Sequence, residues 1–118
     1  MTKGTQSGKI DVLQGTLDLM VLTTLESMGP LHGYGIARRI EQISEATLRL
    51  NEGTVYTSLT RLQQRGWISA TWGTSENNRR AKYYAITRSG RRQLTAETKN
   101  WERIAGVITR LLRTVQQS

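Results

Sequence analysis

One face of the segment spanning residues 50–68 has the side-chain types and the spacing that recognition of a nucleic acid requires. If the segment is a helix, at ~100° per residue this polar face lies opposite an apolar stripe. Glutamine and arginine can read base edges, threonine offers a hydroxyl and a methyl group, and glycine near the helix start lets a phosphate approach the backbone. The polar face consists of Gly53, Thr57, Thr60, Arg61 and Gln64, flanked by Thr54 and Tyr56. The alternative is an ordinary solvated face, which more commonly carries Glu and Lys.

A second group with the same chemistry is the basic segment 79–92, which holds six Arg and Lys residues and no acidic residue. Such a charge density can neutralise several phosphates, and phosphate contacts supply most of the sequence-independent affinity for a nucleic acid. The whole chain is basic as well, because 17 Lys and Arg against 9 Asp and Glu give a net charge of +8. The candidate phosphate contacts are Arg79, Arg80 and Lys82. A solvated hairpin is the alternative.

The chain lacks the residues from which most catalytic and metal sites are built. It has no Cys and one His, so thiol nucleophiles and Cys-based zinc sites cannot be assembled, and neither can most nucleophilic triads and zinc hydrolase sites that need His partners. Neither a G-x-x-x-x-G-K-[ST] nor a G-x-G-x-x-G loop is present. We therefore expect a protein that is not an enzyme and that uses neither a cofactor nor a metal. The lone histidine, His32, is expected to be a turn or helix-cap residue rather than a pH sensor.

Hydrophobic periodicity predicts the elements that position these residues. The predicted order is helix 16–28, helix 31–44, helix 51–65, strand 67–72, a basic loop, strand 81–87 and helix 89–117. Asn51 is a suitable N-cap for the third helix, and Gly66 is a suitable stop. The predicted fold class is mainly α with a small β-hairpin. It is a winged helix-turn-helix domain followed by a long C-terminal dimerisation helix.

These elements divide the chain into three parts. Residues 1–10 are expected to form a disordered N-terminal arm, residues 11–87 the winged-helix DNA-binding domain, and residues 88–118 the C-terminal dimerisation helix. No apolar run reaches 18 residues, and the first 15 residues lack the apolar core of a signal peptide. We therefore expect a soluble cytoplasmic protein.

Aromatic residues of the two predicted strands are expected to build the sheet. Tyr83 and Tyr84 point to opposite faces of their strand, so one of them belongs to the core and the other extends the basic surface. Trp67 and Trp72 are expected to pack against the sheet rather than to stack on bases.

The last helix carries a narrow apolar seam that nothing of comparable length in this chain could cover. Its members advance by 7, 3, 4, 3 and 4 residues. The first helix is apolar on more than one side, since Leu19 and Leu22 lie off its main apolar face. A second copy of the chain would cover both surfaces. The predicted dimer interface is Leu19, Leu22, Leu94, Trp101, Ile104, Ile108, Leu111 and Val115. The alternative is a last helix folded over its own domain.

Trp101 has two interpretations that the sequence does not separate. It is either an anchor of the seam or the wall of an apolar space between subunits where a small aromatic or amphipathic effector stacks.

Four segments in this order resemble the PadR family of bacterial winged-helix transcriptional regulators. They are LQGTLDLMVLTTL, GPLHGYGIARRI, LNEGTVYTSLTRLQQRGWI and SENNRRAKYYAITRSGRRQL. The resemblance covers residues 12–112 and implies a homodimer whose third helices enter successive major grooves while the wings lie on the flanking backbone. It also implies repression, often relieved by a small molecule. The short last helix is similar to that of the subgroup with a single C-terminal helix.

The resemblance carries some residue roles onto this chain. The family's G-T-x-Y segment falls on Gly53, Thr54 and Tyr56, which are therefore expected at the DNA. Its H-G-Y segment falls on His32, Gly33 and Tyr34, and Tyr34 joins the expected DNA contacts. Thr57 departs from the family, because many members have Pro there, so the operator sequence does not transfer.

Two other binding functions compete with that of a sequence-specific regulator, which the resemblance implies is a repressor. A winged helix can serve as a protein-interaction module whose basic wing docks an acidic protein. It can also bind DNA without sequence preference, although the polarity of the third helix argues against this. A specific duplex footprint would discriminate between these functions, whereas salt dependence alone would not.

Overall fold

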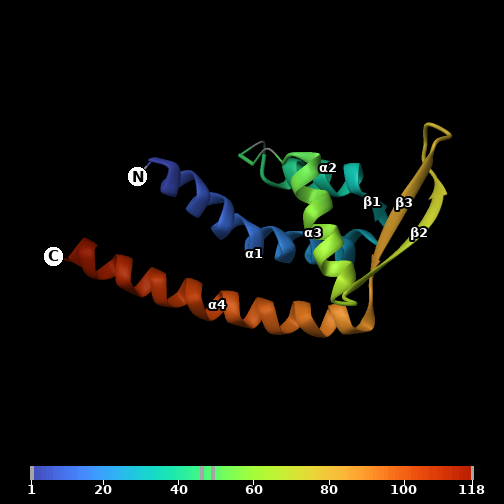
Figure 1. The fold of residues 1–118 in the computed structure, drawn as a ribbon. Coiled ribbons are helices and arrows are strands. Elements are labelled where there is room, and N and C mark those ends of the chain that lie inside the picture. Colours follow the sequence, from blue (N-terminus) through green and yellow to red (C-terminus); the bar gives the residue numbers. More distant parts are fainter. Residues whose placement is uncertain (1, 46, 49, 118) are drawn as a thin grey trace.

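The computed structural model describes residues 2–45, 47, 48 and 50–117, with side chains described from Gly15 onward. Over these residues the chain forms four helices and a small sheet, whose arrangement can be followed in Figure 1. The elements are α1 (Thr2–Met28), β1 (Leu31–His32), α2 (Gly33–Ile43), α3 (Glu52–Gln64), β2 (Ile68–Thr74), β3 (Arg80–Ile86) and α4 (Arg88–Gln117). The predicted fold class, mainly α with a small sheet, is confirmed. Within the described part of the chain, no helix is both long and apolar enough to span a bilayer.

The core lies where α1, α2 and α3 meet one face of the sheet. Each helix contributes residues at helical spacing, and the strands contribute alternate residues. The buried apolar residues are Leu17, Val21, Leu22, Leu25, Ile36, Ala37, Ile40, Val55, Leu59, Leu62, Ile68, Tyr84 and Ile86. Because the apolar stripe of α3 is buried in this core, the polar face on the other side of the helix points away from it.

The sheet has three antiparallel strands in the order β1-β3-β2. The predicted hairpin pairs β2 with β3 from Ile68↔Ile86 to Thr74↔Arg80. The structure adds β1, two residues that pair with Tyr83 and Tyr84. Tyr84 is buried and Tyr83 is half-buried, which confirms the predicted alternation.

The helix boundaries around the polar face of α3 agree with the predicted caps. The side-chain oxygen of Asn51 accepts a hydrogen bond of 2.6 Å from the backbone N–H of Gly53. At the other end Gly66 has a φ of +76°, a left-handed conformation that glycine adopts without strain. His32 is the N-cap of α2, because its Nδ1 accepts a bond of 3.0 Å from the Gly35 N–H. The prediction that His32 is a cap residue is confirmed.

Helix α1 is longer than expected. We predicted a disordered arm over residues 1–10 and a helix start near Thr16, whereas the helix begins at Thr2. Once residues from Leu17 onward are anchored on the core, each additional turn adds hydrogen bonds without a second nucleation cost. The low helix propensity of Gly4, Gly8 and Gly15 therefore does not end the helix.

Two residues expected to contact a second copy are instead packed within their own chain. Leu22 is 1% exposed, because α1 contacts α2, α3, α4 and β3 and is therefore covered on several sides. Leu94 packs partly against the core, because the first turns of α4 return onto α1. The prediction for Leu22 is wrong, and Leu94 is at most a margin of the exposed seam.

Beyond these first turns the two long helices leave the core together. Figure 1 shows the N-terminal half of α1 (blue) and the C-terminal half of α4 (red) extending away from the sheet on the same side. The molecule measures 59 × 33 × 26 Å, and α4 alone runs for ~45 Å at 1.5 Å per residue. These extensions carry the exposed apolar side chains of α4.

Candidate nucleic-acid interface

The outward face of α3 is exposed at the positions expected to read a nucleic acid. Thr57, Thr60 and Gln64 are all exposed, whereas Val55, Leu59 and Leu62 are at most 1% exposed. The hydroxyl of Thr57 donates a 2.9 Å bond to the carbonyl of Gly53 within the helix, so its methyl group is left to face outward. This face presents an amide, a hydroxyl and methyl groups, which match the donors, acceptors and thymine methyl of a major groove.

The start of α2 and the first turns of α3 each carry an exposed tyrosine. Tyr34 is 54% and Tyr56 48% exposed. A Cβ at Gly33 would lie 3.3 Å from Cζ of Tyr56, so the absence of a side chain at Gly33 lets the Tyr56 ring lie against α2. Gly53 and Thr54 are exposed beside them. Gly33 of one family-like segment therefore lies against Tyr56 of the other.

Arg38 extends this surface and was not among the expected residues. Its guanidinium lies 5.8 Å from the centre of the Tyr34 ring, and it donates a 3.5 Å bond to the Tyr34 hydroxyl. The signal in the sequence is the i, i+4 spacing of Tyr34 and Arg38 on one helix.

Arg61 differs from the expectation, because its guanidinium is held inside the molecule. Its Nη2 and Nε donate bonds of 2.6 and 3.0 Å to the two carboxylate oxygens of Asp18 on α1. Ser58, one turn earlier on α3, donates a 2.6 Å bond to the same carboxylate. The prediction that Arg61 reads bases is therefore wrong for this conformation. The sequence signal that we missed is Asp18, the single carboxylate within the apolar segment 12–25.

These bonds also fix the charge state of the guanidinium. The hydrogen bonds with Asp18 raise the pKa of Arg61 above its ordinary value, partial burial lowers it, and Coulomb attraction to Asp18 raises it further. The contact with Asp18 therefore favours the charged form of the guanidinium.

The wing carries the expected cations in an arrangement that the sequence did not predict. Arg79 and Arg80 are exposed and Lys82 is half-buried. The Trp72 indole is 58% exposed, with Cζ of Arg80 at 4.8 Å and Nζ of Lys82 at 5.8 Å from its ring centre. Because Trp72 pairs with Lys82 across the hairpin, the indole orders both cations on one face.

The two tryptophans of β2 and its preceding turn have different roles. Trp67 is half-buried and packs against the core, as expected, with the Arg65 guanidinium 5.2 Å from its ring. Trp72 does not pack the sheet into the core, so that prediction is wrong for this residue. The neighbours shown for its ring are the cations Arg80 and Lys82.

The basic segment 79–92 is divided between two elements. Its first three cations lie at the wing, whereas Arg88, Arg91 and Arg92 belong to the first turn of α4. Arg91 pairs with Glu26 of α1 at 3.1 Å. The wing and α4 therefore hold separate groups of positive charge. Among the described residues, no group of three or more His, Cys, Asp or Glu is placed to hold a metal ion.

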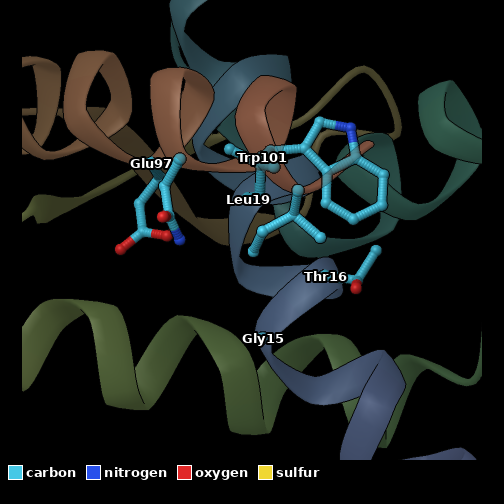
Figure 2. A pocket seen from close by; sticks show the side chains of 7 residues that line it. Gly15, Thr16, Leu19, Glu97 and Trp101 are labelled. Carbon is cyan, nitrogen blue, oxygen red and sulfur yellow. The ribbon is translucent and has the colours of Figure 1, made fainter. Parts of the chain in front are cut away.

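A hollow of about 240 Å³ lies between α1 and α4. Figure 2 shows the Trp101 indole beside Leu19 and Thr16, with Glu97 at the far side. Trp101 is 51% exposed, so one side of its ring is uncovered. Both interpretations of this residue, seam anchor and ligand wall, fit this position.

The seam of α4 is exposed along its length. Its expected members Trp101, Ile104, Ile108, Leu111 and Val115 are 45–72% exposed, and Val107 and Leu112 widen the surface. A continuous apolar surface of this kind marks an interaction site.

The sequence and fold match a known family. A family model described as "Transcriptional regulator PadR-like family" matches residues 21–96. A transcriptional regulator from Clostridium thermocellum has a similar structure, with a TM-score of 0.76, 30% identity, and coverage of 85% of this chain and 93% of that chain. A PadR family transcription regulator from Clostridium difficile R20291 gives a TM-score of 0.69 and 30% identity, with coverage of 81% and 97%. An uncharacterised protein X from Lysinibacillus sphaericus is 28% identical over 98 residues, which are 83% of this chain and 89% of that protein.

Proposed function

The chain belongs to the PadR-like family of transcriptional regulators, and on this premise we propose that it is a sequence-specific DNA-binding repressor that acts as a homodimer. The observation that carries the proposal is the exposed face of α3, where Thr57, Thr60 and Gln64 lie opposite a fully buried stripe. Such a face can form hydrogen bonds with base edges, and because its side chains are uncharged, no charge has to be buried when it enters a groove.

In the proposed complex α3 enters the major groove. Gly53, Thr54 and Tyr56 lie at the start of α3, where the helix dipole favours a phosphate. Tyr34 of α2 contacts the DNA beside them. Arg79, Arg80 and Lys82 of the wing contact the flanking backbone and supply the sequence-independent part of the affinity.

The proposed dimer forms through α4. Exposed side chains of the seam, together with Leu19 of α1, pair with the same surface of a second copy. Two copies of α3 then reach successive major grooves, which requires half-sites about 34 Å apart. A dimer thus converts the short contact of one helix into a site long enough for specific recognition.

We place the effector in the hollow beside Trp101. An indole with one uncovered side favours a small aromatic or amphipathic compound, which would stack on the ring and bury apolar surface. Binding there would release the operator by changing how α1 and α4 pack. As a regulator of transcription the protein acts in the cytoplasm, and no catalytic role, cofactor or metal enters the proposal.

The test is to recover the fragments of the host genome that the purified protein binds, and then to footprint one of them. The expected result is a protected region with two related half-sites separated by one helical turn. A salt-sensitive interaction with an acidic protein, without any duplex footprint, would favour the protein-interaction module instead. Equal protection of any duplex would favour architectural binding.

A further inference from the structure

We propose that Asp18 is a positioning residue for DNA recognition, because its carboxylate sets the rotation of α3 about its own axis. This proposal rests on the proposed function, since it assigns a role in presenting the reading face of α3. Asp18 belongs to α1 and is not among the residues expected to touch DNA.

The carboxylate of Asp18 holds α3 at two successive turns. Ser58 and Arg61 are three residues apart and so lie on the same side of the helix. Ser58 Oγ and Arg61 Nη2 donate to Oδ1, each at 2.6 Å, and Arg61 Nε donates to Oδ2 at 3.0 Å. Ser58 is fully buried, and the side chains of Arg61 and Asp18 are only 19% and 14% exposed. Three short bonds converge on one carboxylate that is largely shielded from water.

These bonds supply a directional restraint that the apolar stripe of α3 does not. Packing of Val55, Leu59 and Leu62 is non-directional and tolerates small rotations by repacking. A two-point contact between a guanidinium and a carboxylate defines an orientation as well as a distance. Asp18 therefore contributes orientation, and the stripe contributes most of the stability.

The restraint lies beside the reading face. At ~100° per residue, the centre of the Ser58 and Arg61 pair lies about a quarter turn from the centre of the face formed by Thr57, Thr60 and Gln64. A rotation of ~20° about the axis moves side-chain ends ~5–6 Å from that axis by ~2 Å. A hydrogen bond to a base edge does not survive such a shift, because donor and acceptor must lie within ~2.7–3.2 Å. A small rotation of α3 would thus remove discrimination between sequences and leave the attraction of the wing for phosphates intact.

The chain offers a matched control on the same helix. Glu26 of α1 also forms an ion pair, with Arg91 at 3.1 Å, but its side chain is 42% exposed and its partner belongs to α4 rather than to α3. Asp18→Asn and Glu26→Gln each convert an α1 carboxylate to an amide and raise the net charge by one. A change of long-range electrostatics affects both variants equally, so a difference between them reports on the contact with α3.

The experiment measures affinities for two duplexes at one salt concentration. One carries the genomic site that the wild-type protein selects, and the other has the same bases in scrambled order. We expect Asp18→Asn to lower the ratio of the two affinities by roughly tenfold, with the affinity for the scrambled duplex unchanged relative to Glu26→Gln. Circular dichroism and thermal unfolding establish that each variant is folded. If Asp18→Asn does not fold, Arg61→Lys replaces it, because lysine keeps the charge but cannot form the two-point contact.

The double variant Asp18→Asn/Arg61→Gln separates positioning from direct reading. If Asp18 acts through Arg61 and Ser58, the double variant discriminates no worse than Asp18→Asn alone. Two results would overturn the proposal. One is full discrimination by Asp18→Asn, and the other is a double variant that discriminates less well than Asp18→Asn alone, which would make Arg61 a direct reader of bases. If the wild-type protein prefers no genomic duplex, the proposed function itself fails, which is a different outcome.

Discussion

Asp18 of α1 and Arg61 of α3 face each other across the core boundary, with carboxylate and guanidinium joined by bonds of 2.6 and 3.0 Å. This ion pair links the helix that lines the hollow beside Trp101 to the helix that presents Thr57, Thr60 and Gln64. It removes Arg61 from the reading face. The remaining face is uncharged, so its contribution to sequence discrimination can be tested separately from that of the basic wing.

Gln64→Ala is expected to lower discrimination between operator and random duplex by ~1–3 kcal/mol, because one amide that can bond a base edge is lost. The measurement is a pair of binding titrations at fixed salt. Gln42→Ala, an exposed glutamine near the C-terminal end of α2, is the control and should change neither affinity. Equal losses of affinity for both duplexes in Gln64→Ala would contradict a reading role.

Arg80→Ala is expected to weaken binding to operator and random duplexes by the same factor, since a phosphate contact carries no base information. The slope of log affinity against log salt should fall in magnitude by about one. Arg113→Ala removes the same charge from the side of α4 opposite the seam and should leave the slope unchanged. A selective loss for the operator would instead place Arg80 at a base edge.

Ile108→Glu is expected to dissociate the proposed dimer, because it places a charge in the exposed apolar seam that a second copy would bury. The dimer dissociation constant should rise by ~100-fold or more, as for truncation of an interface anchor. Thr109→Glu adds the same charge on another side of α4 and serves as the control. Sedimentation at micromolar concentration measures both, and a folded wild-type monomer would reject the seam as an interface.

Tyr84 is expected to make the free energy of unfolding depend on pH in the alkaline range. Burial raises the pKa of its phenol above the ordinary value of 10, and the nearby Tyr56 adds to the rise. Because the folded protein holds this proton more tightly than the unfolded chain, the contribution is fully present below pH 10 and is lost as the pH rises through the folded-state pKa. The free energy of unfolding should fall less steeply above pH 10 in Tyr84→Phe. Parallel curves for the two proteins would contradict this, and Tyr83→Phe is the matched control.

Gly90 is expected to tolerate no side chain. A Cβ there would overlap the backbone carbonyl of Trp67 and lie 2.8 Å from Cγ1 of Ile86, at the point where α4 begins against the sheet. Gly90→Ala should therefore lower the free energy of unfolding by ~1–3 kcal/mol. Gly106→Ala is the control in the same helix, because a Cβ at Gly106 would meet no heavy atom within 4 Å. This second change should be neutral or stabilise by ~0.5–1 kcal/mol. Urea unfolding measures both variants. If the two substitutions change the free energy of unfolding equally, the backbone around Gly90 shifts enough to accommodate a side chain, and the prediction is wrong.

Much of the fold and part of the site could be predicted from local patterns. The periodicity of apolar residues placed α2, α3, α4 and the hairpin, because each element forms hydrogen bonds within a short stretch of chain. Asn51, Gly66 and His32 act at helix ends through bonds to residues two to five positions away, so their roles follow from the sequence. The exposure of Thr57, Thr60 and Gln64 followed from the burial of the opposite stripe.

Contacts between distant segments were decided only by the tertiary structure. Arg61 finds its partner 43 residues earlier in the chain, and no periodicity of α3 specifies which helix carries the matching carboxylate. Leu22 is buried because α1 is covered on several sides, and Trp72 is exposed because the wing extends past those covers. A sequence determines which face of each element is apolar or polar through local geometry. Which neighbour meets that face depends on how all the elements pack, and that packing is a property of the whole chain.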